Sequence, residues 1–260
     1  MRVVIDRVSK TYADRRGQAI EALRDVSLTV ESEEFVALVG PSGCGKSTLL
    51  NVVAGLTRPS AGAVELEGDF APGRSATAMV FQESALFPWR TVQANVEFGL
   101  EELGVAPAER VRRAREHLAL TGLAGFETRY PHQLSGGMRQ RVGIARALAV
   151  DPAVLLMDEP FSALDAQTRR LLQEELLTIR ERTRKTIVYV THTIQEAVWL
   201  ADRVVVLSRR PGRVLATVPI PLGRPRTEAQ LVEPGFVGAV ERLWSLIKAE
   251  ALGALREAPA

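Results

Sequence analysis

The sequence predicts an α/β fold with a mostly parallel sheet, an antiparallel β subdomain near the N-terminus and an inserted helical subdomain. Four short apolar runs are continuous rather than alternating, as in central strands covered on both faces. These runs are FVALVG at 35–40, AVLLM at 153–157, IVYVT at 187–191 and VVVLS at 204–208. Helix-like segments separate them, which is the order expected of parallel strands.

Other segments depart from this pattern. DVSLTV at 25–30 and AVELEG at 63–68 alternate apolar and polar residues, which is typical of half-exposed antiparallel strands. Residues 84–150 interrupt the α/β order with helical periodicity, and the run GGMRQRVGIARALA places its apolar residues on one face. We therefore expect this segment to pack as a separate layer of helices.

We expect residues 1–260 to form one domain. The α/β core and its β subdomain occupy residues 1–83 and 151–220, and the helical subdomain occupies residues 84–150. Apolar residues at helical spacing predict a C-terminal helical extension over residues 221–260.

Composition narrows the class of protein. Hydrophobic residues make up 46% and charged residues 25% of the chain, as in ordinary soluble globular proteins. The 33 basic and 31 acidic residues nearly balance, so we expect no nucleic-acid partner and interpret clusters such as Arg139–Arg146 as solvated helix faces. The single cysteine excludes an internal disulfide and fits a reducing compartment. We expect neither a secretory signal nor a membrane span, so any channel would be another chain.

The segment GPSGCGKST fits the phosphate-loop pattern G-x-x-x-x-G-K-[ST] and lies between a buried strand and an apolar helix. Its glycines let backbone N–H groups converge on phosphate oxygens, while Lys46 supplies charge and Ser47 a hydroxyl for Mg²⁺. We therefore predict a P-loop NTPase core that uses ATP and Mg²⁺. Cys44 is interpreted as a small residue rather than a redox group, and its alkylation should impair nucleotide binding. The predicted ATP-binding residues of this loop are Gly40, Pro41, Ser42, Gly43, Cys44, Gly45, Lys46, Ser47 and Thr48.

The run VLLMDEP ends in two consecutive carboxylates, Asp158 and Glu159. Because side chains alternate along a strand, we expect the two to point in different directions. Asp158 would then face the metal beside Ser47, and Glu159 would face the attacking water as general base. The alternative is a strand-ending turn whose acids cap a helix or pair with arginines. The phosphate loop in the same chain favours the catalytic interpretation.

A second candidate anion site begins at LSGGMRQR. Ser135, Gly136 and Gly137 precede a basic helical run, and such a helix start offers uncovered N–H groups to an anion. It belongs to the helical insertion, far along the chain from the phosphate loop. We therefore expect two copies, arranged head to tail about a twofold axis, to complete each other's nucleotide sites.

Together these motifs resemble the nucleotide-binding subunit of an ATP-binding-cassette (ABC) transporter. GPSGCGKST resembles its Walker A motif, VLLMDEP its Walker B motif and LSGGMRQR its signature. The family order holds from the N-terminus to about residue 220, and the three motifs together are highly specific. The resemblance implies ATP hydrolysis in an interleaved homodimer. It assigns to the partner's nucleotide the signature residues Leu134, Ser135, Gly136, Gly137 and Gln140.

The resemblance also assigns roles that spacing alone does not reveal. Tyr12 in SKTY matches the aromatic residue that stacks on adenine. Gln82 in MVFQE matches the glutamine that contacts Mg²⁺ and the lytic water and senses the membrane partner. His192 in YVTH matches the histidine that contacts the γ-phosphate. SALD matches the loop that crosses the dimer interface, formed by Ser162, Ala163, Leu164 and Asp165.

Two further segments indicate a branch of the family. ESALFPWRTVQANVEFGL and SRRPGRV resemble importer subunits that serve nitrate, taurine, alkanesulfonates and related small solutes. This branch implies a peripheral subunit on the cytoplasmic face of the cell membrane, bound to an integral membrane permease that works with an extracytoplasmic solute-binding protein. Trp89 and Arg90 would face the permease, although Trp89 would serve equally to fix the start of the next helix.

Two other functions fit parts of the sequence. An ABC-type ATPase module could drive a mechanical or regulatory process without transport. A P-loop kinase would transfer phosphate to a small molecule, but a kinase needs an acceptor pocket rather than a second clamp for a triphosphate. ATP-dependent dimerisation separates the first two functions from the kinase, and copurification with an integral membrane chain separates the importer from the non-transport module.

Overall fold

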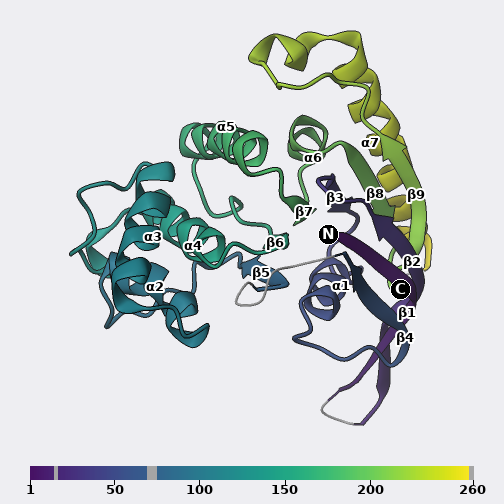
Figure 1. Ribbon diagram of the computed structural model, residues 1–260. Coiled ribbons are helices and arrows are strands. Elements are labelled where there is room, and N and C mark those ends of the chain that lie inside the picture. Colours follow the sequence, from purple (N-terminus) through teal and green to yellow (C-terminus); the bar gives the residue numbers. More distant parts are fainter. Residues whose placement is uncertain (15–16, 69–74, 258–260) are drawn as a thin grey trace. The chain divides into compact units, whose positions relative to one another are not determined.

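The chain divides into two compact units (Figure 1). In the computed structural model the described residues are 1–14, 17–68 and 75–257, with side chains as far as residue 250. The first unit joins Met1–Gly68 to Thr186–Ala260, and the second is Asp69–Lys185. Parts of the expected core at 69–74 and of the expected C-terminal extension at 258–260 lie outside the described residues. None of the helices in the described ranges is long and apolar enough to cross a bilayer.

The first unit contains an antiparallel sheet of three strands in the order β2-β1-β4. The strands are β1 (Arg2–Ala13), β2 (Ala19–Val30) and β4 (Ala61–Glu67). The predicted antiparallel strands are confirmed, but β2 begins six residues earlier than its alternating pattern indicated. The pattern fails there because Asp25 has φ 51° and the pairing of β1 with β2 shifts register between Val8 and Lys10.

The same unit holds four further strands, side by side in the order β7-β3-β8-β9. They are β3 (Phe35–Val39), β7 (Thr186–Val190), β8 (Arg203–Leu207) and β9 (Val214–Pro219). β3 runs parallel to β7 and β8, and only β9 is antiparallel to its neighbour. Every residue of β3 and β7 is buried, as predicted for continuous apolar runs. The helices of this unit are α1 (Lys46–Val53), α6 (Ile194–Leu200), the 3₁₀ helix η2 (Glu228–Val232) and α7 (Pro234–Glu257).

The second unit combines a parallel strand pair with the inserted helices. The strands are β5 (Thr77–Val80) and β6 (Val154–Asp158). The helices are α2 (Val92–Glu102), α3 (Pro107–Leu120), the 3₁₀ helix η1 (Pro131–Gln133), α4 (Gly136–Ala149) and α5 (Ala166–Thr183). α2, α3 and α4 pack against one another (Figure 1) around a core that includes Val96, Leu118 and Val142. The predicted helical insertion is thus confirmed.

Parallel pairing brings the candidate residues to strand ends. Leu38 pairs with Val190 and Val39 with Val206, so the chain leaves β3, β7 and β8 at one edge of the first unit. In the second unit Val80 pairs with Met157, so the chain likewise leaves β5 and β6 at one edge. Loops at the carboxyl ends of parallel strands are where α/β proteins bind ligands.

Candidate nucleotide site

The phosphate loop joins β3 to α1 through glycines in unusual conformations. Gly43 has φ 74° and Gly45 has φ 104°, left-handed values that residues with side chains rarely adopt. A Cβ on Gly45 would lie 2.6 Å from Leu23 Cδ2 of β2, so the loop also requires glycine for space. Gly45 is the N-cap residue of α1 and has no side chain to cap it. The first N–H groups of α1 are therefore free of a side-chain cap and suited to an anion.

Lys46 is the first residue of α1 and is only 6% exposed. Its Nζ donates to the carbonyl oxygens of Gly40 at 2.9 Å and Pro41 at 3.1 Å. The ammonium group is thus folded back over the loop. Phosphate oxygens would offer it stronger, charge-assisted hydrogen bonds than these two carbonyls do.

Cys44 is fully buried within the loop, and its N–H donates to the Pro41 carbonyl at 3.3 Å. Burial raises the pKa of the Cys44 thiol, although the nearby Lys46 acts in the opposite direction. A buried neutral thiol is a poor nucleophile, in agreement with its interpretation as a small packing residue. Alkylation of Cys44 therefore requires the loop to open first.

His192 is exposed and follows β7 at the edge that carries the phosphate loop. Hydrogen bonds fix the backbone on either side of it. The Thr191 N–H donates to the Leu38 carbonyl at 3.2 Å, and the Thr193 N–H donates to Thr191 Oγ1 at 3.0 Å. The first unit thus brings His192 and Gly40 to the same sheet edge.

Tyr12 lies on β1, opposite Ile20, and is 40% exposed. Lys10 Nζ lies 4.9 Å from the centroid of its ring. Lys10 also pairs across the sheet with Leu23, the residue that packs beside Gly45. Tyr12 therefore extends outward from the part of the antiparallel sheet that meets the phosphate loop, and its adenine-stacking role stays a prediction.

The two carboxylates mark the end of β6 in the second unit. Asp158 is the last residue of the strand, and Glu159 has φ 44°, a left-handed value that is uncommon for glutamate. Glu159 thus lies one residue beyond the strand, so strand alternation does not set its direction, and the expected separation of the two carboxylates stays a prediction. The Glu159 carbonyl accepts hydrogen bonds from Ser162 N at 3.2 Å and Ser162 Oγ at 2.9 Å, which hold the turn. Backbone strain of this kind concentrates at functional sites.

Three predicted motifs meet around a cavity of about 260 Å³ in the second unit. Its lining residues are Gln82, Glu83, Ser84, Gly136, Arg139, Gln140, Pro160, Ala163 and Leu164. Gln140 is 4% exposed, and its Nε2 donates to the Phe81 carbonyl at 3.2 Å. This bond joins the signature helix to the residue before Gln82. The structure thus brings together the glutamine, the signature and the SALD loop.

The signature helix α4 begins at an exposed turn. Ser135 is its N-cap residue, and Ser135 Oγ accepts a hydrogen bond from Met138 N at 3.2 Å. A Cβ on Gly137 would lie 2.6 Å from Thr168 Cγ2 of α5, so this glycine allows the two helices to pack closely. Gly136 is exposed and leaves the helix start open, while Leu134 is buried in the helical core. The helix start is therefore accessible to an anion from outside the unit.

The SALD segment connects Glu159 to α5. Asp165 is the N-cap residue of α5, and its Oδ1 accepts from Thr168 N at 2.9 Å and Gln167 N at 3.1 Å. These backbone hydrogen bonds lower the pKa of Asp165. Ala163 is exposed, as a loop at a subunit interface would be in a single chain.

Asn95 is a residue to which the sequence interpretation gave no role. It is fully buried in α2, and its Oδ1 accepts from Phe87 N at 2.8 Å while Nδ2 donates to the carbonyls of Arg90 and Thr91 at 3.1 and 3.0 Å. These bonds hold the bend before α2. Thr91 caps this helix and Trp89 is 72% exposed, so Trp89 is not what fixes the helix start. A polar residue on the apolar face of a predicted helix is the one signal that could have identified Asn95.

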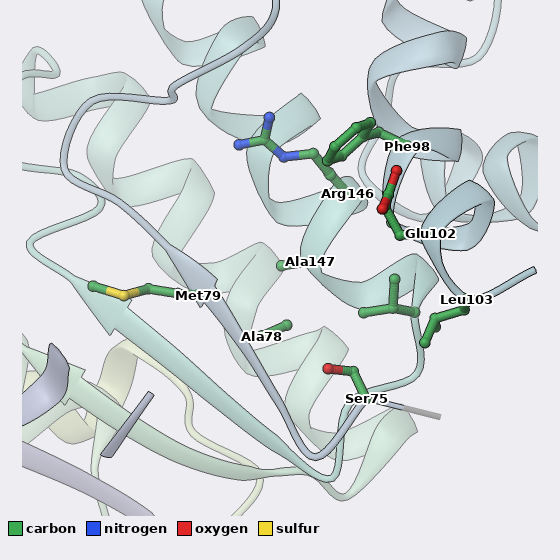
Figure 2. A pocket seen from close by; sticks show the side chains of 10 residues that line it. Ser75, Ala78, Met79, Phe98, Glu102, Leu103, Arg146 and Ala147 are labelled. Carbon is green, nitrogen blue, oxygen red and sulfur yellow. The ribbon is translucent and has the colours of Figure 1, made fainter. Parts of the chain in front are cut away.

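A second cavity, of about 300 Å³, is lined by residues of α2, α4 and β5 (Figure 2). Phe98 and Glu102 of α2 lie near Arg146 of α4 in this view. Arg146 donates to the carbonyls of Ser84 at 2.9 Å and Ala85 at 2.8 Å, and burial lowers its pKa. The interpretation of the Arg139–Arg146 cluster as a solvated face is therefore wrong for Arg146, which fixes the segment after Gln82.

Three features define the class of this protein: a phosphate loop between a parallel strand and a helix, carboxylates at a strand end and a second exposed helix start. Together they are typical of P-loop ATPases that carry a cassette signature. Residues 23–162 match the family described as ABC transporter. The chain belongs to this family and is an ABC-type ATPase.

Curated relatives agree over most of the chain. An ABC transporter ATP-binding protein of Methanocaldococcus jannaschii, described as uncharacterized, is 46% identical over 257 residues, which are 98% of this chain and 95% of that protein. The taurine import ATP-binding protein TauB of Yersinia pestis bv. Antiqua (strain Antiqua) is 50% identical over 224 residues, covering 86% of this chain and 87% of that protein.

Solved structures agree with the fold. One is the dimeric structure of a post-hydrolysis state of an ATP-binding cassette bound to ADP and Pi. It matches with a TM-score of 0.74 and 35% identity, and the match covers 85% of this chain and 100% of that chain. The predicted fold class, a P-loop NTPase core with an antiparallel β subdomain and helical insertion, is thus confirmed.

Proposed function

We propose that residues 1–260 form one ATPase domain that acts as the motor subunit of an importer for a small solute. One observation carries this proposal: the phosphate loop and the exposed signature helix start occur in one chain, which therefore offers two sets of phosphate-binding N–H groups. Two chains arranged head to tail would use both sets on each nucleotide. A solved relative that is dimeric and bound to ADP and Pi supports the pairing of two chains.

Each predicted site residue has a role in this proposed mechanism. The N–H groups of the phosphate loop and Lys46 bind the phosphates, and Tyr12 stacks on adenine. Glu159 accepts a proton from the attacking water, and His192 contacts the γ-phosphate. The signature turn of the partner, beginning at Ser135, stabilises the charge that develops on the γ-phosphate, and the loop at 162–165 crosses the dimer interface.

Mg²⁺ fits the donors that the chain offers. Oxygen ligands suit this hard cation, and the chain offers the hydroxyl of Ser47 in the first turn of α1, the amide of Gln82 after β5 and the carboxylate of Asp158 at the end of β6. These three residues would hold the ion, which when bound neutralises phosphate charge.

The membrane partner would bind beside α2. Trp89 is 72% exposed, and its ring lies 5.6 Å from that of Phe87, which in turn lies 4.6 Å from the ring of Phe98. An aromatic cluster with an exposed Trp89, in which Phe98 also lines the cavity of Figure 2, suits an apolar segment of a permease. Arg90, paired with Glu101 at 2.7 Å, would border this contact. The subunit would then lie peripherally on the cytoplasmic face of the membrane, with a solute-binding protein outside.

We propose taurine, an alkanesulfonate or nitrate as the solute, the class that the sequence resemblance indicates. TauB, which is 50% identical and named for taurine import, supports the first of these. The test is growth of the native host carrying Glu159→Gln at its own locus, with each compound as the sole sulfur or nitrogen source. We expect loss of growth on one source and rescue by sulfate or ammonium. Normal growth on all three would contradict the proposed solute class and favour another cargo or a non-transport role.

A further inference from the structure

The loop that joins β8 to β9, residues 208–213 with the sequence SRRPGR, leaves the sheet at the same edge as the phosphate loop. Val39, the last residue of β3, pairs with Val206 of β8. A Cβ on Gly40 would lie 2.7 Å from the carbonyl oxygen of Leu207, the last residue of β8, so the phosphate loop begins close to the start of the 208–213 loop.

Gly212 is the residue of the 208–213 loop that lies against the phosphate loop. It is buried, its N–H donates to the Ala22 carbonyl at 2.9 Å, and its own carbonyl accepts from Arg24 N at 3.0 Å. These bonds attach the loop to β2. A Cβ on Gly212 would lie 2.0 Å from the carbonyl oxygen of Cys44, in the middle of the phosphate loop. The φ of Gly212 lies outside the left-handed region, so the glycine is required for space and not for conformation.

The 208–213 loop is itself held at two points. The Arg213 N–H donates to Ser208 Oγ at 3.0 Å, and the Ser208 N–H donates to the Arg213 carbonyl at 2.9 Å, which closes the loop. The carboxylate of Glu250, on α7, accepts a hydrogen bond from Arg209 N at 2.9 Å. A continuous set of contacts therefore runs from the C-terminal helix through this loop to Cys44.

We propose that the 208–213 loop braces the phosphate loop, with Gly212 as a positioning residue and Glu250 as the anchor on α7. The brace keeps the backbone around Cys44 in the shape that directs N–H groups at phosphate before nucleotide arrives, so its loss weakens ATP binding rather than hydrolysis. The inference rests on the proposed binding of ATP by residues 40–48. It gives the C-terminal helix a role in setting nucleotide affinity.

The direct test is Gly212→Ala in the full chain, compared with Gly238→Ala, a helix glycine whose Cβ would meet no atom within 4 Å. The added methyl must displace the Cys44 carbonyl, so we expect the Kd and KM for Mg-ATP to rise about tenfold or more while kcat at saturating ATP stays within about twofold. Gly238→Ala should match the parent protein. An unchanged Kd in Gly212→Ala, or a fall in kcat alone, would overturn the proposal.

A second variant covers the case in which Gly212→Ala fails to fold. Glu250→Ala removes the anchor and adds no bulk, and Glu241→Ala changes another glutamate of α7 as the control. We expect Glu250→Ala alone to weaken Mg-ATP binding about threefold and to speed alkylation of Cys44 by iodoacetamide. Because Cys44 is the single cysteine, labelling reports the loop directly. Equal affinity and labelling in the two variants would reject the anchor.

Failure of the proposed ATP site itself would give a different result. In that case the parent protein would bind Mg-ATP no better than Lys46→Ala does, whatever residue stands at 212. If instead Lys46→Ala abolishes binding, the ATP site stands, and brace variants that bind Mg-ATP as tightly as the parent reject the brace alone.

Discussion

Glu159 is the residue on which hydrolysis depends in the proposed mechanism. Glu159→Gln removes the proton acceptor but keeps the size of the side chain. We expect turnover to fall by at least about a hundredfold, in the range of general-base contributions, with Mg-ATP affinity nearly unchanged. Phosphate release and nucleotide binding would be measured in the same preparation. Glu181→Gln, an exposed change on α5, is the matched control and should keep parental turnover.

If Glu159→Gln retains parental turnover, Glu159 is not the general base, and the alternative interpretation, in which the acids cap a helix or pair with arginines, is favoured. If it loses ATP binding as well, Glu159 supports the site rather than acting on water. A loss of turnover alone assigns it to the chemical step.

Residues differ in how well the sequence predicts them. The place of Lys46 in a loop at the start of α1 was predictable, because it follows from a local pattern of nine residues, GPSGCGKST. The turn at Glu159, with φ 44°, was not, because the hydrogen bonds from Ser162 that hold it leave no pattern of their own. Gly212 was still less predictable, since its close neighbour Cys44 lies far away in the sequence.

At the scale of elements, the buried strands and the signature helix were predicted well. Every residue of β3 and β7 is buried, and strands that are buried on both faces consist of consecutive apolar residues, which the sequence shows directly. The first half of β2 was missed because a bulge near Asp25 interrupts alternation. The position of the bend before α2 was also missed, because it depends on hydrogen bonds to a single buried side chain, Asn95.

The start of α5 gives a prediction about pH. Asp165 caps this helix through hydrogen bonds that favour its charged form and lower its pKa in the folded protein. A lowered folded pKa contributes stability above the unfolded value of about 3.9, and that contribution is lost as pH falls toward the folded value. Asparagine also caps helices but does not ionise. We therefore expect the difference in Tm between the parent and Asp165→Asn, measured by circular dichroism, to shrink below about pH 4. A Tm difference that is constant with pH would show that the charge of Asp165 does not stabilise the cap.

For the whole molecule, the predicted motifs are distributed over two compact units, whereas the sequence interpretation had placed Gln82 and the two carboxylates in one core with the phosphate loop. The phosphate loop and His192 belong to the first unit, and the carboxylates, Gln82 and the signature belong to the second. Motif order along one chain could not reveal which residues share an edge, because parallel pairing decides that. It also could not reveal the cavity where Gln82 meets the signature helix.

The head-to-tail dimer is the prediction that belongs to this scale. If the exposed start of α4 binds the γ-phosphate on another copy, slow hydrolysis should trap the pair with ATP between its members. We expect Glu159→Gln to be monomeric without nucleotide and dimeric at saturating Mg-ATP, as measured by light scattering after size exclusion.

Adding Ser135→Arg to the Glu159→Gln protein places a bulky side chain at the start of α4 and should keep the protein monomeric while ATP still binds to the phosphate loop. Ser135→Ala in the same background removes the cap without adding bulk, so it controls for the lost hydrogen bond, about 1 kcal/mol in typical helices. A Glu159→Gln protein that stays monomeric with ATP bound would reject the shared site for the isolated subunit, whereas a dimer that tolerates Ser135→Arg would show that the contact lies elsewhere.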